Sequence, residues 1–203
     1  MTVWQGRRGG ILACFFLLAL ANCGGGGGGG DSGGGGTVIA DFAPACLTTD
    51  VCYSSSVTLQ KGMASGDTVG VQAVLNKLNT PIGVASLLIG FDSTVAQFIC
   101  SQANCVDGFA EGPALGTSAQ GTTYLVTLAP GELLVDVLPP IGGKSISSAQ
   151  VILTLSFKAL KVGSTGLVFK SVDTLNGSAL FRPDESIILL FAAGWSGGLL
   201  TGS

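Results

Sequence analysis

Short apolar runs, each ended by a turn-forming residue, constrain the fold of this chain more than any other feature. From Ser56 onward they recur without a convincing long helical pattern, and Gly, Pro, Asn or Asp closes most of them. The predicted strands lie near residues 57–59, 69–73, 84–91, 124–128, 133–138, 151–160, 166–172, 186–193 and from Trp195 onward. Because a parallel sheet needs crossover helices, we predict an all-β fold, an antiparallel β-sandwich or jelly roll of about nine strands.

Four segments between these runs are predicted to lack strand structure. Residues 79–81 (NTP) and 176–178 (NGS) have the composition of turns. Ser93 is placed to cap a single helical turn that ends at Phe98. The stretch from Val106 to Gly121 carries little strand signal, and we interpret it as a connecting loop.

The N-terminal residues have the composition of an export signal. Two arginines precede eleven wholly apolar residues, 11–21, and this run is shorter than the roughly 17 residues that a membrane-spanning helix needs. The sequence LANC, which ends at Cys23, then resembles the lipobox of bacterial lipoproteins, with Asn22 in place of the usual Gly, Ala or Ser. This resemblance implies that residues 1–22 are removed and that Cys23 carries lipid. The alternative is an ordinary secretory signal that leaves Cys23 as a free or disulfide-linked thiol.

A tract of almost pure glycine follows Cys23. Residues 24–36, GGGGGGGDSGGGG, offer no side chain to bury, so they are expected to form a disordered linker with a reach of roughly 20 Å. We therefore divide the chain into a signal peptide (1–22), a lipidated cysteine with its linker (23–36) and one folded domain (37–203). The expected location is the bacterial cell envelope, where the lipid holds the domain close to a membrane.

The four cysteines of the predicted domain form two close pairs. Five residues separate Cys46 from Cys52, and four separate Cys100 from Cys105. An exported chain enters an oxidising compartment, so we predict the disulfides Cys46–Cys52 and Cys100–Cys105. The alternative is a zinc site, but these spacings are looser than those of zinc knuckles and the chain has no histidine. We expect neither a metal nor a cofactor.

The charge and the missing histidine exclude several functions. Without the export segment, seven Lys and Arg stand against 12 Asp and Glu, which disfavours nucleic acid as a partner. Nucleophilic catalysis with a histidine base is impossible here. Glycoside hydrolysis needs two facing carboxylates. The candidates, most of them in or beside predicted turns, are Glu111, Glu132, Asp136, Asp184 and Glu185. We therefore expect a protein that is not an enzyme.

The order of motifs from Ser56 to Ser203 resembles that of cohesin domains, the modules that bind dockerins in cellulosomes. The matching positions are a Gly66-Asp67 turn, a Phe91-Asp92 corner that ends an apolar strand, and a Phe157-Lys158 pair before a glycine-rich turn. Ser93 replaces the proline that usually follows the corner, and the cysteine-bracketed insert 100–121 is not typical of the family. The resemblance implies a jelly roll that serves as a non-catalytic adhesion or scaffolding module, with one sheet face docking a dockerin-type protein.

The same resemblance suggests which residues meet the partner. In the strand near residues 84–91, the family pattern places alternate residues, beginning with Leu87, in the core, so that Ser86, Leu88 and Gly90 face outward. A carbohydrate-binding module is the first alternative, and it would depend on Trp195, because flat glycan platforms need exposed aromatic rings. The second alternative is a structural surface lipoprotein with no dedicated ligand.

Overall fold

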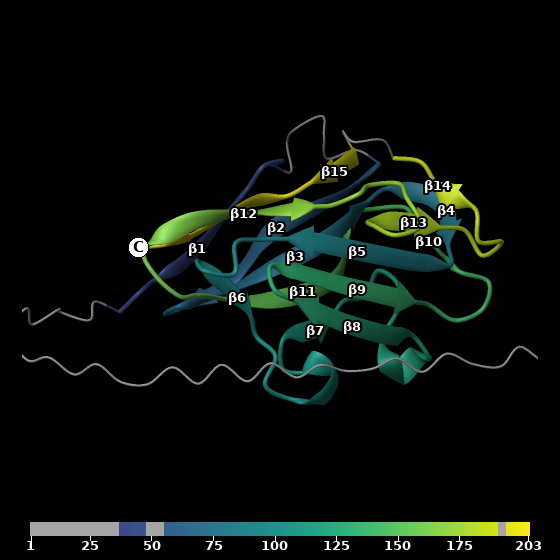
Figure 1. Ribbon diagram of the computed structural model, residues 1–203. Coiled ribbons are helices and arrows are strands. Elements are labelled where there is room, and N and C mark those ends of the chain that lie inside the picture. Colours follow the sequence, from purple (N-terminus) through teal and green to yellow (C-terminus); the bar gives the residue numbers. More distant parts are fainter. Residues whose placement is uncertain (1–36, 48–54, 191–193) are drawn as a thin grey trace, which may run out of the picture. The chain divides into compact units, whose positions relative to one another are not determined.

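The predicted strands assemble into two β-sheets that pack face to face (Figure 1). The computed structural model describes residues 37–47, 55–190 and 194–203, and most regular structure in these ranges is strand. Two short 3-10 turns, η2 (Ala103–Cys105) and η3 (Ser118–Gln120), are the helical elements found there. None of the described helical segments is long and apolar enough to cross a bilayer. The prediction of an all-β sandwich is confirmed, although the strands are more numerous than the nine expected.

The first sheet has the strand order β1-β16-β12-β5-β9-β8. Two further short strands, β13 and β14, extend it, and β13 pairs with the part of β5 that β12 leaves free. Its members are β1 (Ala40–Pro44), β5 (Val84–Gly90), β8 (Thr123–Ala129), β9 (Glu132–Leu138), β12 (Gly163–Phe169), β13 (Ala179–Phe181), β14 (Ile187–Ile188) and β16 (Gly198–Gly202). The pairings are antiparallel throughout.

The second sheet has the order β15-β2-β3-β11-β6, and β7 also pairs with β11. Only the contact between β15 and β2 is parallel among these pairings. The members are β2 (Ser56–Ser65), β3 (Thr68–Asn76), β6 (Ala96–Phe98), β7 (Phe109–Glu111), β11 (Gln150–Ala159) and β15 (Trp195–Ser196). A separate ribbon joins β4 (Leu78–Ile82) to β10 (Lys144–Ile146).

The core lies between the inner faces of the two sheets, because alternate strand residues point toward it. In β9, for example, the three inward residues are buried while the four others are partly exposed. The ring of Phe157 packs edge-on against Phe91 and Phe98, with centroid distances of 5.4 and 5.7 Å. Such edge contacts add to the stability that burial of these large rings provides.

Local structure differs from the prediction at several places. Residues 79–81 belong to strand β4 rather than to a turn, because β10 supplies a pairing partner. Residues 93–95 form a turn and β6 follows, so the predicted helical turn to Phe98 is wrong. Asp92 rather than Ser93 caps this turn, since its carboxylate accepts a 2.8 Å hydrogen bond from the Thr94 amide.

Three further differences concern which residues form strands. The segment predicted as a plain loop, 106–121, contains β7 and η3, because β7 gains hydrogen bonds from β11. Strand β1 was not predicted, and it is held by pairing with the distant C-terminal strand β16. Of the strand expected over 186–193, only β14 is formed within the described residues.

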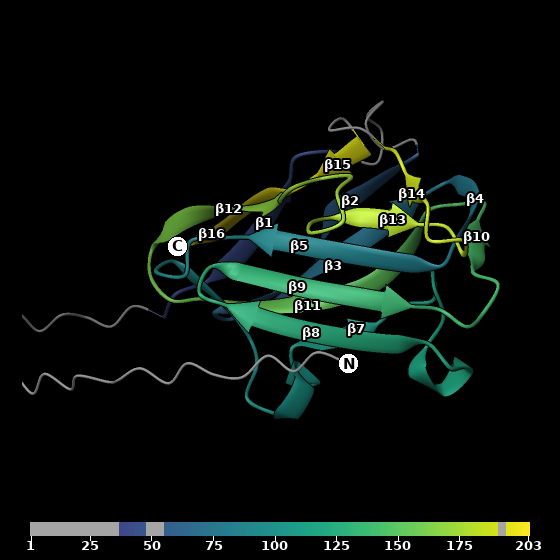
Figure 2. The ribbon, with the colours of Figure 1, turned by 45° about the vertical axis from the view of Figure 1, so that its right-hand side comes forward.

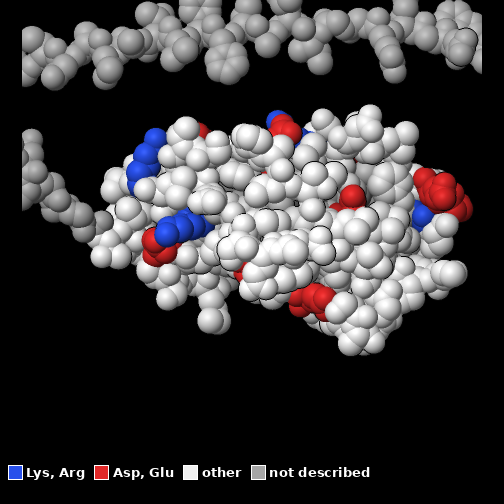
Figure 3. Space-filling view, turned by 60° about the horizontal axis from the view of Figure 1, so that its bottom comes forward, with Lys and Arg blue, Asp and Glu red and all other residues white. Residues whose placement is uncertain are grey.

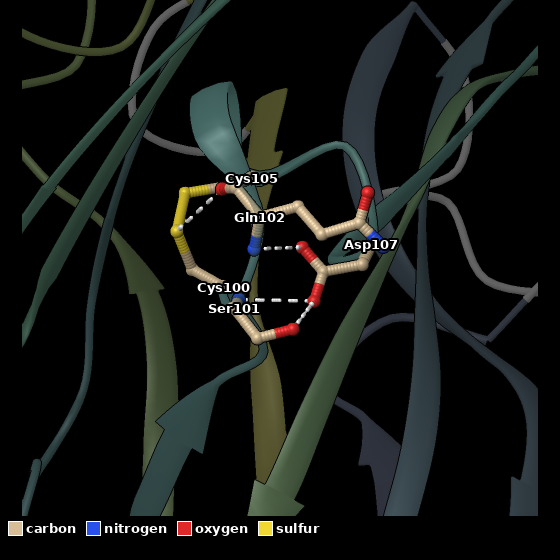
Figure 4. Close-up of a disulfide and its surroundings, with 5 residues drawn as sticks. All are labelled: Cys100, Ser101, Gln102, Cys105 and Asp107. Atoms are coloured by element: carbon tan, nitrogen blue, oxygen red, sulfur yellow. Dashed lines mark hydrogen bonds between the residues drawn. A yellow bond between two sulfur atoms is a disulfide. The ribbon is translucent and has the colours of Figure 1, made fainter.

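The disulfide between Cys100 and Cys105 is present, as predicted, with a Cα–Cα distance of 4.4 Å. Asp107 closes the same loop, because its carboxylate accepts hydrogen bonds from the Ser101 hydroxyl and from the amides of Ser101 and Gln102 (Figure 4). These donors hold the pKa of Asp107 below its usual value, with the Ser101 hydroxyl as the largest cause. Cys46 is also disulfide-bonded. Its predicted partner Cys52 lies outside the described residues, as do Cys23 and the export segment.

Candidate docking face

The residues predicted to meet a partner lie on β5, which pairs with β9 and through it with β8, and we call the outer surface of these three strands the docking face. The three strands lie side by side in both ribbon views (Figures 1 and 2). Alternation along each strand decides which residues face outward. These are Ser86, Leu88 and Gly90 of β5, Glu132, Leu134, Asp136 and Leu138 of β9, and Thr123, Leu125, Thr127 and Ala129 of β8.

Aliphatic side chains occupy the middle of the docking face. Leu88 lies directly opposite Leu134, which in turn lies opposite Thr127 on β8. Leu125 is 52% exposed on the neighbouring row. Side chains that face each other across antiparallel strands are close enough to form one surface, so these leucines make a shared apolar patch. Figure 3 presents a side of the domain on which uncharged residues dominate and charged groups are few.

One carboxylate stands within this apolar patch. Asp136 lies opposite Ser86 on β5 and opposite Leu125 on β8. Among the described residues, none of the ion pairs and none of the side-chain hydrogen bonds engages its carboxylate. A partly exposed acid without a cation beside it is a site at which a basic group of a partner gains a charge pair.

One end of the docking face is closed by a salt bridge. Lys170 binds Glu132, and its aliphatic stem lies over Gly90, where an added Cβ would meet the Lys170 side chain at 2.7 Å. Glycine at position 90 therefore leaves the space that the lysine stem occupies. The cation of this pair is already engaged, so it does not neutralise Asp136.

The edge of β5 that does not pair with β9 is bordered by two strands with an insert between them, and this insert lies beside the predicted partner site. β12 pairs with Gly90 and Ile89, and β13 resumes at Ser86, so the residues between the two strands form an insert opposite Leu88. The Ser178 hydroxyl replaces the missing strand there, since it accepts a 3.0 Å hydrogen bond from the Leu88 amide and donates one of 2.9 Å to the Leu88 oxygen. The backbone of β5 thus remains satisfied despite the interruption.

The three residues predicted to meet a partner differ in accessibility. All three lie on the outward side of β5 by alternation, but only Leu88 keeps a partly exposed side chain. Ser86 is 8% exposed, and Gly90 is buried beneath Lys170. The neighbouring residues Leu125 and Asp136 were not predicted. The strands predicted near 124–128 and 133–138, together with the period of two along a strand, were the signal that could have placed them on one face.

Trp195 is not available as a surface platform. Its side chain is 7% exposed, and the ring packs edge-on against Phe169 at a centroid distance of 5.1 Å. The indole nitrogen donates a 2.9 Å hydrogen bond to the Asp173 carboxylate. A buried ring with a satisfied N–H is a structural anchor for β15, and a sugar cannot stack on it in this arrangement.

Three of the five acidic residues considered for catalysis each bind a different partner. Glu111 accepts a 2.9 Å hydrogen bond from the Ser118 amide, and Glu132 pairs with Lys170. Asp184 accepts bonds from the hydroxyl and the amide of Ser186, which lower its pKa, the hydroxyl being the larger cause. A general acid needs a raised pKa. In the part of the chain that the structure describes, no three metal-binding side chains cluster.

Solved structures with a similar fold include cohesin modules of Acetivibrio cellulolyticus. A chain of an interface mutant of the type II cohesin–X-dockerin complex matches with a TM-score of 0.53 at 18% identity, covering 66% of this chain and 91% of that one. The second type II cohesin module of the adaptor scaffoldin gives 0.52 at 17% identity, with coverages of 66% and 83%. A type II cohesin domain from the cellulosome gives 0.51 at 16% identity, with coverages of 66% and 88%.

These likenesses establish the fold: the domain has the architecture of cohesin modules, as the motif order had implied. No family model matches the sequence, and no curated protein matches it. At such low identity the fold does not carry over the partner, since one fold serves many functions. The side chains of the docking face therefore have to support any functional assignment.

Proposed function

We propose that this protein is a non-catalytic binding module that docks a protein partner on the outer surface of β5, β9 and β8. The observation that carries the proposal is the apolar patch of Leu88, Leu134 and Leu125 around the unpaired carboxylate of Asp136. Exposed apolar patches with a few polar groups are typical of protein interaction sites.

A protein partner suits this surface better than a polysaccharide. The outward positions of the three strands hold aliphatic, hydroxyl and acidic residues, and none of them is aromatic. Glycan platforms depend on stacking against exposed rings. The buried ring of Trp195 removes the candidate on which that alternative depended. We therefore favour a protein partner, and the binding test below includes polysaccharides to check the alternative.

The proposed class of partner is a dockerin-type module. The similarity to a chain from a cohesin–X-dockerin complex supports this choice. The chain's lack of histidine and the separate engagement of Glu111, Glu132 and Asp184 agree with a role in binding rather than catalysis. We further propose that Cys23 is lipidated and that the glycine tract lets the domain reach a partner near the envelope surface, in an assembly that acts on polysaccharide.

The proposal is tested by binding of the purified full-length protein, in detergent, to a panel of calcium-loaded dockerin modules and to soluble and insoluble polysaccharides. Leu125→Asp and Leu88→Asp each place a charge in the apolar patch. We expect each to weaken dockerin binding at least about thirtyfold, because a charge in a desolvated interface centre costs 2 kcal/mol or more. Met63→Asp is the matched control, since Met63 is 90% exposed on the other sheet.

Two results would contradict the proposal. One is that the Leu125→Asp and Leu88→Asp variants bind dockerin as strongly as the Met63→Asp variant does. The other is binding to polysaccharide alone, which would assign the domain to carbohydrate recognition. Leu125 is exposed, so its substitution reports on binding even if Leu88→Asp disturbs folding.

A further inference from the structure

A hollow of about 570 Å³ lies at the end of the docking face opposite the Lys170–Glu132 salt bridge. Three of its walls are residues that end the strands of that face or its neighbour, namely Val84, Leu138 and Phe181. Phe181 pairs with Val84 across β13 and β5, so these two side chains stand on the same outward side. The hollow is thus a continuation of the docking face and not a separate site.

Loops with unusually exposed aliphatic residues form the rim of the hollow. Ile141 is fully exposed in the loop after β9, and Leu175 is 75% exposed in the insert between β12 and β13. Prolines 139, 140 and 183 complete the apolar lining, while Arg182 and Glu185 supply its charges. Ile141 and Leu175 thus expose large aliphatic side chains to solvent around an apolar hollow. Such exposure indicates a surface that becomes buried in a complex.

The floor of the hollow is held in shape by close backbone packing. An added Cβ on Gly83 would meet the Pro183 Cα at 2.8 Å. One on Gly143 would meet the Ile82 oxygen at 2.7 Å and the Pro183 Cγ at 2.8 Å. Gly143 also has a φ of +69°, which favours glycine. The loop after β9 and the turn at Pro183 therefore approach each other more closely than other residues would allow. Preformed walls reduce the ordering cost of binding.

The unpaired carboxylate of Asp136 lies near this hollow. Asp136 and Leu138 occupy the same outward side of β9, two residues apart, which corresponds to about 7 Å along a strand. None of the ion pairs among the described residues joins Arg182 to this acid, and the Arg182 guanidinium donates instead to the Ser186 hydroxyl at 3.2 Å and to the Ile187 oxygen at 3.4 Å. An apolar hollow and a free negative charge thus stand side by side.

We propose that this hollow is the anchor site of the docking face and that the partner fills it with an aromatic side chain next to a basic residue that pairs with Asp136. This inference rests on the proposed function and specifies the chemistry of the partner. Aromatic residues suit the site because they bury a large apolar area with few rotatable bonds, and anchors of this kind dominate interface energetics. The basic neighbour provides selectivity through charge complementarity.

The first test uses N-acetyl-L-tryptophanamide as the probe and isotope-labelled full-length protein in detergent, followed by NMR. We expect saturable shifts confined to amides of residues 82–84, 138–143 and 172–185. Leu175→Asp should weaken binding about tenfold, the loss expected from one leucine contact. Leu175 is exposed, so this variant keeps its fold, and Met63→Asp should bind like the parent. Absent or dispersed shifts, or affinity unchanged by Leu175→Asp, would overturn the anchor site.

The second test compares two charged probes, N-acetyl-Lys-Trp-amide and N-acetyl-Glu-Trp-amide. The lysine probe should bind about fivefold tighter, in line with surface ion pairs. Asp136→Asn should abolish this difference, and the control variant Met63→Asp should keep it. Equal binding of both probes to the parent protein, or a difference that persists in Asp136→Asn, would refute the role of Asp136.

These tests separate the inference from the proposed function. If the tryptophan probe binds at the hollow but no dockerin module binds the protein, the anchor site is supported and only the proposed partner class is rejected. Dockerin binding that depends on Leu125, together with no probe binding, would reject the anchor site and leave the docking face standing.

Discussion

Tyr124 is a residue whose pKa is changed by the side chains and backbone that surround it. Its hydroxyl donates a 2.6 Å hydrogen bond to the Gly116 oxygen, and its ring stacks on Phe109 at 5.5 Å. Burial, with a smaller effect of the Glu111 carboxylate, raises the pKa of Tyr124 to about 12. The neutral phenol is therefore favoured in the folded state, and the stabilisation it provides is present below pH 10 and lost as the pH rises toward 12.

This environment predicts an alkaline titration that absorbance near 295 nm can follow. One tyrosinate should appear close to pH 12 in the folded protein, and Tyr124→Phe should remove that step. Tyr53, which lies outside the described residues, is the internal reference in both proteins. If both tyrosines of the parent ionise together near pH 10 while the fold persists, the buried hydrogen bond to Gly116 is not formed in solution.

At the level of elements, the stapled loop 100–107 joins β6 to β7. The Cys100–Cys105 disulfide and the three hydrogen bonds accepted by Asp107 both act within this loop. Replacing both cysteines by serine should lower the free energy of unfolding by about 2 kcal/mol, the chain-entropy effect of so small a loop. Urea denaturation of the non-reduced protein measures the change.

The matched control is the parent protein treated with reductant under conditions that leave Cys46 oxidised, as verified by peptide mapping. It should lose the same stability as the double serine variant. A double variant as stable as the parent would mean that Asp107 alone maintains the loop. The slope of the denaturation curve should not fall, because the native buried area is unchanged and the unfolded chain without the cross-link is no more compact.

At the scale of the whole molecule, the prediction concerns how the domain is held at a membrane. Cys23→Ser should move the protein from the membrane fraction to the soluble fraction, because two or three acyl chains hold a protein on a bilayer. Cys14→Ser, a cysteine within the apolar export run, is the matched control and should stay with the membrane. Mass spectrometry of the N-terminal peptide should show acylated Cys23 in the parent. Membrane retention of Cys23→Ser would place the anchor elsewhere.

Local patterns in the sequence were sufficient for the architecture. Alternating apolar residues and frequent turn residues predicted an all-β sandwich, and the spacing of Cys100 and Cys105 predicted their disulfide. These features depend on neighbours in the chain, which is why the sequence reveals them. Strands β1 and β4 escaped prediction because each exists only through a partner that the sequence does not identify locally, β16 in one case and β10 in the other.

The identity of the accessible residues required the tertiary structure. The family resemblance placed Ser86, Leu88 and Gly90 on one side of β5, yet Ser86 and Gly90 are buried, and Gly90 lies beneath the Lys170 side chain. Ser178, ninety positions from Leu88, completes the sheet there, and Lys170 lies over Gly90. A pattern of period two tells which way a side chain points but not what packs over it. The leucine patch, the free carboxylate of Asp136 and the hollow beside it therefore follow only from how distant strands and loops meet.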